Sequence, residues 1–247
     1  MGKRAVVVLA LMMLFGLVTG TARATQYSPP WAHVHYAQFA YKLGWGSGWL
    51  QDAGYGVYSQ SGLSSWAHWN HMKSDAVYMW AGHANVGGGW YYPNDNLSPR
   101  IHGKGGTNSD PVYYISNYGS ADITDVLVLM LIGCDTAITH AYSGNLLDEA
   151  RAKGVDVAIG RPNQIASNTA PVLGMGFIRG ARFAPSRAID YLQGFNAGVD
   201  NDLMQYAYDY MLNNCVNEPE ITKITLQTWV TKGWSSQTMQ PARYGNP

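Results

Sequence analysis

The sequence predicts an α/β protein with a mainly parallel sheet, and three observations carry this prediction. Val126–Cys134 (VLVLMLIGC) and Val155–Gly160 (VDVAIG) are largely apolar runs without strict alternation, as expected of strands buried on both faces. Ser143–Gly154, between them, has helical character and ends in glycine. Strand, helix and strand in this order are typical of a βαβ unit whose helices cover the faces of a parallel sheet.

The segments that precede this unit are assigned from the same patterns. Tyr55–Ser61 alternates like a short strand, and Gly62–Met72 begins with serines suited to N-capping and continues with helical spacing. Asp75–His83 is an apolar run that we expect to be a strand ending in Gly-His. Trp31–Leu50 has loosely helical apolar spacing, so we expect a helix there and no strand before it.

The remaining segments give weaker patterns. Gly87–Pro111 is rich in Gly, Pro, Asn and Asp and predicts a loop, and Val112–Asn117 predicts a short strand or hairpin arm. Ser186–Cys215 predicts one or two helices, and Ile221–Val230 alternates like a late edge strand.

The first residues, 1–24, predict a secretory signal peptide. A basic start (MGKR) precedes a 14-residue apolar run, Ala5–Val18, and Ala22 and Ala24 give the small-x-small cleavage pattern. The run is too short and wrongly flanked for a membrane span, although an uncleaved anchor is the alternative. We therefore expect a mature chain of residues 25–247 that is secreted or periplasmic, with no stable membrane span after cleavage.

Length and composition favour one domain over residues 25–247, with a core at about 55–160 and a C-terminal helical part at about 165–247. The chain has 16 Lys and Arg and 16 Asp and Glu. Three of the basic residues lie in the predicted signal peptide, which leaves a mature net charge near −3. No basic patch stands out, so nucleic acid is not expected as a partner.

Two of the expected strands end in reactive residues, His83 and Cys134. Ligands of parallel sheets bind beyond the carboxyl ends of the strands, and adjacent strands lie roughly 5 Å apart. If the two strands are neighbours, the imidazole and the thiol emerge at the same edge. A thiolate can attack an acyl carbon while an imidazole handles the proton of the leaving amine. The backbone N–H groups of Cys134 and of Ala84 or Asn85 are candidates for binding the oxyanion.

Three segments, DAVYMWAGHA, LVLMLIGCDTA and GNLLDEARAKGVDVAIG, together resemble the caspase-like cysteine peptidases over Asp75–Gly160. This group holds the caspases, gingipains, clostripain and the CHAT domains, and the CHAT pattern is especially similar. The resemblance implies a caspase-like three-layer sandwich with a mainly parallel sheet, in a secreted thiol protease. It implies that His83 is the general acid/base and Cys134 the nucleophile, with oxyanion donors at the backbone N–H groups of Cys134 and Ala84. A peptide or protein substrate is expected, and no cofactor.

Several residues around the dyad carry further expectations. The family usually has Gly after its His, and Ala84 stands there, so a backbone angle suited to glycine would strain it. The small residues Gly82, Ala84 and Gly133 are expected to leave room for a substrate backbone. Asp135, next to the nucleophile, either orients the loop or attracts a basic side chain of the substrate.

Other classes of function remain open from the sequence. An inactive relative on the same fold could bind a glycan or a protein through its Trp-rich and Tyr-rich loops. Cys134 and Cys215 are the only two cysteines, and in an exported protein they could form a disulfide, which would remove the nucleophile.

The histidines offer a third function. His33 and His35 share a face if their segment is extended, and His68 and His71 share a helix face. With a carboxylate, the two pairs could hold zinc in a zinc-dependent hydrolase. Neither HExxH nor CxxC accompanies them, so no metal site is expected.

Overall fold

The structure is a computed structural model that describes residues 30–84, 90–91, 100–102, 112–139, 144–162, 174, 178 and 230–233 of the 247-residue chain. The predicted signal peptide, the helices expected at Ser186–Cys215 and all but the last residue of the strand expected at Ile221–Val230 lie outside these residues. Among the residues described, no helix is long and apolar enough to cross a membrane.

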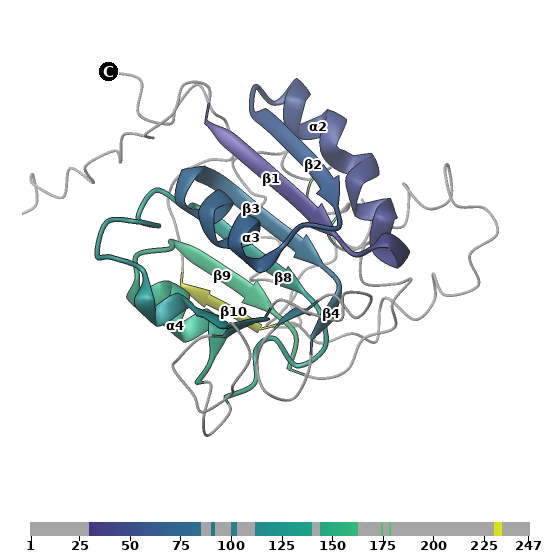
Figure 1. Cartoon of the computed structure of the whole chain (residues 1–247). Coiled ribbons are helices and arrows are strands. Elements are labelled where there is room, and N and C mark those ends of the chain that lie inside the picture. Colours follow the sequence, from purple (N-terminus) through teal and green to yellow (C-terminus); the bar gives the residue numbers. More distant parts are fainter. Residues whose placement is uncertain are drawn as a thin grey trace, which may run out of the picture.

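A six-stranded sheet forms the centre of the molecule, in the order β10-β9-β8-β3-β1-β2 (Figure 1). The strands are β1 (Trp31–Tyr36), β2 (Gly56–Ser61), β3 (Asp75–Ala81), β8 (Val128–Ile132), β9 (Val157–Gly160) and β10 (Val230–Gly233). Neighbouring strands are parallel except for β10, which runs antiparallel to β9 at the edge. The predicted α/β class and mainly parallel sheet are therefore confirmed.

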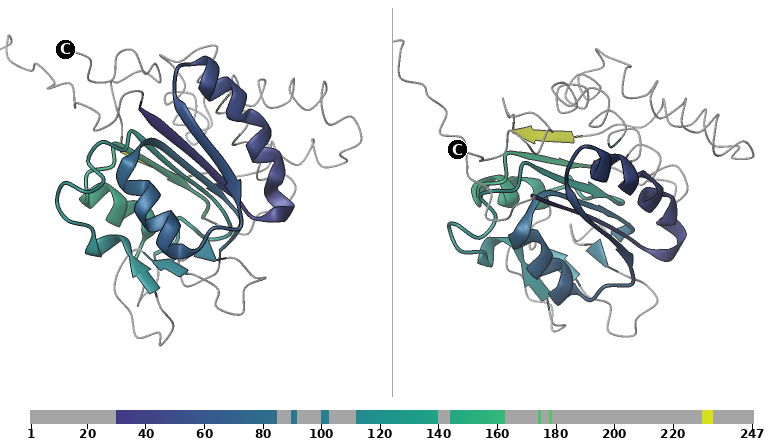
Figure 2. Two further views of the ribbon diagram at one scale, coloured as in Figure 1. Left: turned by 45° about the horizontal axis from the view of Figure 1, so that its top comes forward. Right: turned by 90° about the horizontal axis from the view of Figure 1, so that it is seen from above.

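Helices cover both faces of this sheet, which gives three layers (Figure 2). The 3-10 helix η1 (Gln38–Gly46) and helix α2 (Ser47–Asp52) connect β1 to β2. Helix α3 (Ser65–His71) and the short turn η2 (Met72–Ser74) lead from β2 to β3, and α4 (Leu146–Ala152) leads from β8 to β9. β2 and β3 lie on opposite sides of β1, so the chain crosses the sheet in opposite directions in the two connections, β1 to β2 and β2 to β3. Right-handed crossovers therefore place the helices of these two connections on opposite faces of the sheet.

The sequence patterns of the inner strands reflect this double coverage. Every residue of β8 and β9 is buried, whereas the edge strand β2 is largely exposed. Trp80, Leu131 and Leu147 belong to the core beneath α3 and α4. On the opposite face, Leu43 and Ile132 meet at Gly174. Burial on both faces explains why these strands lack alternation.

The main departure from the sequence prediction is β1. A helix is predicted within Trp31–Leu50, and the structure instead has strand β1 before η1 and α2. The prediction is wrong for Trp31–Tyr36 because His33 and His35 interrupt the apolar pattern. Both histidines are nevertheless buried, with 6% and 0% of their surface exposed. Their burial depends on α3 packing over them, which local sequence does not reveal.

A second sheet of four short strands lies between β3 and β8 in the chain, in the order β4-β5-β6-β7. Its strands are β4 (His83–Ala84), β5 (Trp90–Tyr91), β6 (Arg100–His102) and β7 (Val112–Tyr114), and η3 (Ile115–Asn117) follows. The loop prediction for Gly87–Pro111 is wrong at β5 and β6, because such short strands are fixed by pairing with β4 and β7 rather than by their own pattern.

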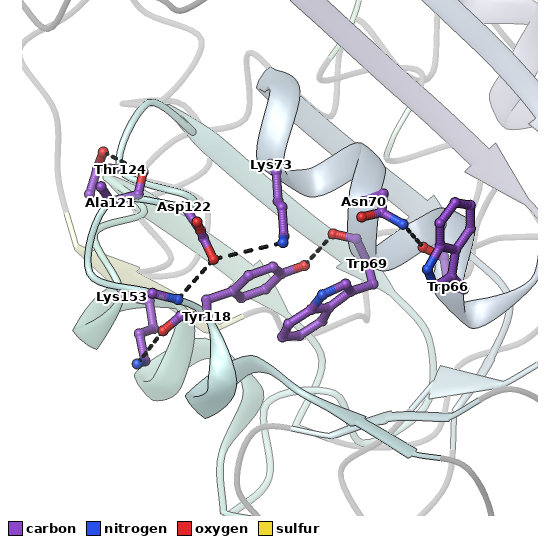
Figure 3. Close-up of polar contacts among 10 residues, drawn as sticks. Trp66, Trp69, Asn70, Lys73, Tyr118, Ala121, Asp122, Thr124 and Lys153 are labelled. Carbon is purple, nitrogen blue, oxygen red and sulfur yellow. Dashed lines mark hydrogen bonds and ion pairs between the residues drawn. The ribbon is translucent and has the colours of Figure 1, made fainter.

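Helix α3 is fastened to the segment that precedes β8 (Figure 3). The rings of Trp69 and Tyr118 stack at a centroid distance of 3.6 Å and an angle of 4°, and the Tyr118 hydroxyl donates to the Trp69 carbonyl oxygen at 2.8 Å. Lys153, at the end of α4, donates to the Tyr118 carbonyl oxygen at 2.6 Å. These contacts hold α3 and α4 in fixed positions above the sheet.

Candidate active site

His83 and Cys134 lie at the same edge of the main sheet, beyond the carboxyl ends of two adjacent strands. β3 and β8 are parallel neighbours whose last paired residues are Ala81 and Ile132. Beyond this pair, the Gly82 N–H donates to the Ile132 carbonyl oxygen at 3.0 Å. His83 and Cys134 each follow two residues after that last pair. The two side chains predicted to form a dyad are thus brought to one edge by co-directional strands.

His83 is held by the second sheet as well as by β3. It opens β4 two residues after the end of β3 and pairs with Tyr91 of β5, so its backbone is held between the two sheets. Its side chain is partly exposed, and partial burial lowers its pKa from the ordinary value of 6.5. The imidazole is therefore neutral at neutral pH and able to accept a proton.

Ala84 follows the histidine without backbone strain. Asp135 is the one described non-glycine residue with a positive φ, at 59°, so Ala84 does not adopt the left-handed conformation that favours glycine. The condition under which alanine would be strained at this position is therefore not met. Its side chain is buried and packs in the core beside Trp80.

The indole of Trp80 packs against the two glycines that precede His83 and Cys134. A Cβ on Gly82 would meet indole atoms of Trp80 at 2.5 to 3.1 Å, and a Cβ on Gly133 would meet Trp80 Cζ3 at 2.8 Å. These two glycines precede His83 and Cys134. The space beside them, expected to take a substrate backbone, is thus occupied by the protein's own tryptophan. The glycines are needed because both strand ends pass close over one buried ring.

Cys134 begins a tight turn after β8. Its side chain is partly exposed and carries a thiol, while Cys215 lies outside the described residues. The next residue, Asp135, takes φ 59° and is only 7% exposed. Asp is among the few residues that tolerate this conformation. The left-handed backbone conformation of Asp135 changes the direction of the chain directly after Cys134.

Thr136 and Asn145 hold this turn in place. The fully buried Thr136 hydroxyl donates to the Leu131 carbonyl oxygen at 2.9 Å and accepts the Arg161 N–H at 2.9 Å, joining the ends of β8 and β9. The Asn145 side chain accepts from the Leu147 N–H at 2.9 Å as the N-cap of α4, and donates to the Ala137 carbonyl oxygen at 2.8 Å. The loop carrying Cys134 is therefore anchored at several points.

Arg161 is a further candidate that the sequence reasoning missed. It directly follows β9, the next parallel strand, and so reaches the same edge of the sheet. Burial lowers the pKa of Arg161, while the negative charges of Cys134 and Asp135 act to raise it, so both groups lie near the guanidinium. Asp135 therefore lies near Arg161 at this edge of the sheet. The rule that directed attention to His83 and Cys134, applied to β9, would have found Arg161.

A cluster of four histidines lies on the α3 face of the sheet, and we call His33, His35, His68 and His71 the histidine cluster. His33 and His35 come from β1, and His68 and His71 come from α3. The rings of His33 and His71 stack at 4.4 Å, and His35 Nε2 lies 3.1 Å from His71 Nδ1. His68 meets His35 edge-on at 5.1 Å and bonds through Nδ1 to the Tyr78 hydroxyl. Each pair shares the face predicted from its spacing, and the fold brings the two pairs together.

The histidine cluster is uncharged at neutral pH. The pKa of His33 and that of His68 are both lowered to about 3, mainly by burial and to a smaller extent by the neighbouring imidazoles. The same causes lower the pKa of His35 well below 6.5, with the backbone of Gln60 opposing them, and burial lowers that of His71. Neutral imidazoles are the form that binds metal ions. Ligand atoms of His33, His35 and His71 all lie within 4.8 Å of one another, and among the residues that the structure describes no carboxylate joins this group.

Comparisons with protein-family models, with curated proteins and with solved structures gave no match.

Proposed function

We propose that this chain is a secreted, caspase-like cysteine endopeptidase in which His83 and Cys134 form the catalytic dyad. The observation that carries the proposal is the delivery of these two residues to one sheet edge by the adjacent parallel strands β3 and β8. In open parallel sheets, this edge is where ligands bind. The three layers and the mainly parallel sheet are compatible with the caspase-like sandwich that the sequence resembles.

The proposed reaction has two covalent steps. Neutral His83 accepts the thiol proton, and the Cys134 sulfur attacks the carbonyl carbon of the scissile peptide bond. The carbon–nitrogen bond breaks when the imidazolium returns that proton to the departing amine, leaving a thioester on Cys134. A water molecule, deprotonated by His83, then attacks the thioester and releases the carboxylic acid and the thiol. The backbone N–H groups of Cys134 and Ala84 are the proposed donors to the oxyanion.

The surroundings of the sulfur support the proposed site. The guanidinium of Arg161 lies near Cys134 and Asp135, since charge on both groups acts to raise its pKa. The turn after β8 carries both Cys134 and Asp135. Thr136 and Asn145 keep that turn rigid, as a site that must hold reacting atoms within a few tenths of an ångström requires.

A fluorogenic peptide library, with and without a thiol-alkylating inhibitor, tests the proposal. We expect hydrolysis that iodoacetamide abolishes and that Cys134→Ala removes, while Cys215→Ala, the matched control, retains it. Peptide mapping should find the alkyl group on Cys134.

Other outcomes would favour the other functions. Hydrolysis that survives Cys134→Ala and disappears with a chelator would indicate a zinc-dependent hydrolase. Glycan or protein binding without cleavage of any peptide would indicate a binding protein. A mass lower by two hydrogen atoms under non-reducing conditions would indicate a Cys134–Cys215 disulfide and exclude the dyad.

A further inference from the structure

We propose that His33, His35 and His71 form a binding site for a divalent transition-metal ion, with Zn²⁺ as the physiological candidate. The site would join β1 to α3 and is separate from the proposed dyad, so it does not depend on the peptidase function. The inference rests on three nitrogen donors that converge from two elements far apart in the chain.

The spacing of the donors suits a small ion. Two nitrogen ligands at about 2.0–2.1 Å from a tetrahedral zinc ion are separated by roughly 3.3 Å. His35 Nε2 and His71 Nδ1 are already 3.1 Å apart, and a ring nitrogen of His33 lies within 4.8 Å of both. A modest rotation of the His33 and His71 rings would bring all three nitrogens onto one ion. His71 is only partly buried, so it has room to adjust.

The chemistry of the donors selects the type of ion. Imidazole suits zinc, copper and nickel, whereas calcium and magnesium require oxygen ligands, and no carboxylate of the described part of the chain belongs to this group. Three histidines leave the fourth tetrahedral position for water or an anion.

The surroundings of the cluster also fit a metal site. His35 is completely buried, and the Gln60 backbone lies close enough to its ring to raise its pKa, although Nδ1 makes no hydrogen bond of ordinary distance and angle to the described residues. A histidine that ligates a metal commonly directs its other ring nitrogen at a backbone carbonyl or a carboxylate, so the Gln60 backbone beside this ring suits a metal ligand. Tyr58, 39% exposed and edge-on to His71, marks the side that is open to solvent. An ion could therefore enter at the edge strand β2.

The experiment measures zinc binding by the full chain prepared without a polyhistidine tag and treated with a chelator. Because a thiol–imidazole pair can also bind zinc, the reference protein is the double variant His83→Ala/Cys134→Ala. Equilibrium dialysis gives the stoichiometry, and thermal unfolding with and without Zn²⁺ gives the shift in Tm. The test variant is His71→Gln in the same background, chosen because His71 is the most exposed of the three ligands.

We expect the double variant to bind one zinc ion and to gain thermal stability from it, since a ligand specific to the folded state stabilises that state. His71→Gln should weaken zinc binding by at least about 100-fold, more than loss of an outer-shell partner does. Bound Co²⁺ should give the strong visible absorption of a tetrahedral site and no thiolate charge-transfer band. A folded double variant that binds no zinc, or one that binds it equally well after His71→Gln, would overturn the proposal.

Discussion

Gly82→Ala should destabilise the protein because the added methyl group collides with the indole of Trp80. The three atoms nearest to a Cβ at this position all belong to that indole, at 2.5, 3.0 and 3.1 Å. Contacts below 3.0 Å require something to shift. Trp80 is completely buried in the core beneath α3 and α4, so its ring cannot swing away.

The magnitude follows from this geometry. Overpacking of a dense core costs about 1–3 kcal/mol, and a collision with a fixed ring favours the upper half of that range. Trp80→Phe removes the indole atoms concerned and by itself costs about 2 kcal/mol through the cavity it leaves. In the Trp80→Phe background, Gly82→Ala should therefore cost less than about 1 kcal/mol. The two substitutions should show a coupling free energy of at least about 1 kcal/mol, in the range found for residues in contact.

Urea unfolding of the four proteins of this cycle gives the coupling free energy. Gly48→Ala is the matched control, because nothing lies within 4 Å of a Cβ there and its φ is not positive. Since alanine is the better helix former, that control should stabilise α2 by about 0.5–1 kcal/mol. A Gly82→Ala variant as stable as the wild type, or one equally destabilised with and without the indole, would refute the packing we describe.

Three further predictions follow from the structure. Thr136→Val should lower the free energy of unfolding in urea by about 2–4 kcal/mol, because the buried Arg161 N–H and Leu131 carbonyl oxygen lose a partner. Thr136→Ser keeps the hydroxyl and should cost less than half of that. Equal losses for the two variants would contradict the role of the hydroxyl. Tyr118→Phe should cost about 0.5–1.5 kcal/mol by removing the bond to Trp69 while keeping the ring stack, and an unchanged midpoint would argue against that bond. In the pH profile of kcat/KM, the midpoint of the acid limb should lie below pH 6.5, because burial lowers the pKa of His83 and keeps the base neutral to lower pH. A midpoint above pH 6.5 would contradict this.

The buried strands could be predicted from the sequence because their burial appears directly in residue type. β3, β8 and β9 are apolar on both faces, and α4 has a capping Asn145 and a glycine after its last turn. Strand β1 could not be predicted in this way, since two of its six residues are histidines. Its identity depends on α3 covering those histidines, which is a tertiary effect.

The candidate site was predictable where it depends on the strand ends and unpredictable where it depends on side-chain packing. The edge shared by His83 and Cys134 follows from a rule about parallel strands and needed only the two strand ends. The ring of Trp80 beneath Gly82 and Gly133 depends on side-chain packing that no local pattern encodes. The convergence of His33 and His35 with His71 likewise requires the placement of α3 on the sheet. Spacing predicts which residues share a face, but not which two faces meet.

The most direct test of the dyad is a kinetic cycle of Cys134→Ala, His83→Ala and the double variant, assayed on the best peptide of the library. If the imidazole acts through the thiol, each single substitution should remove most of kcat/KM, with His83→Ala costing about 10²–10⁴-fold. The double variant should be no slower than Cys134→Ala alone, since residues that act as a unit are not additive. Losses that multiply in the double variant would show that the two residues act independently and would contradict the dyad.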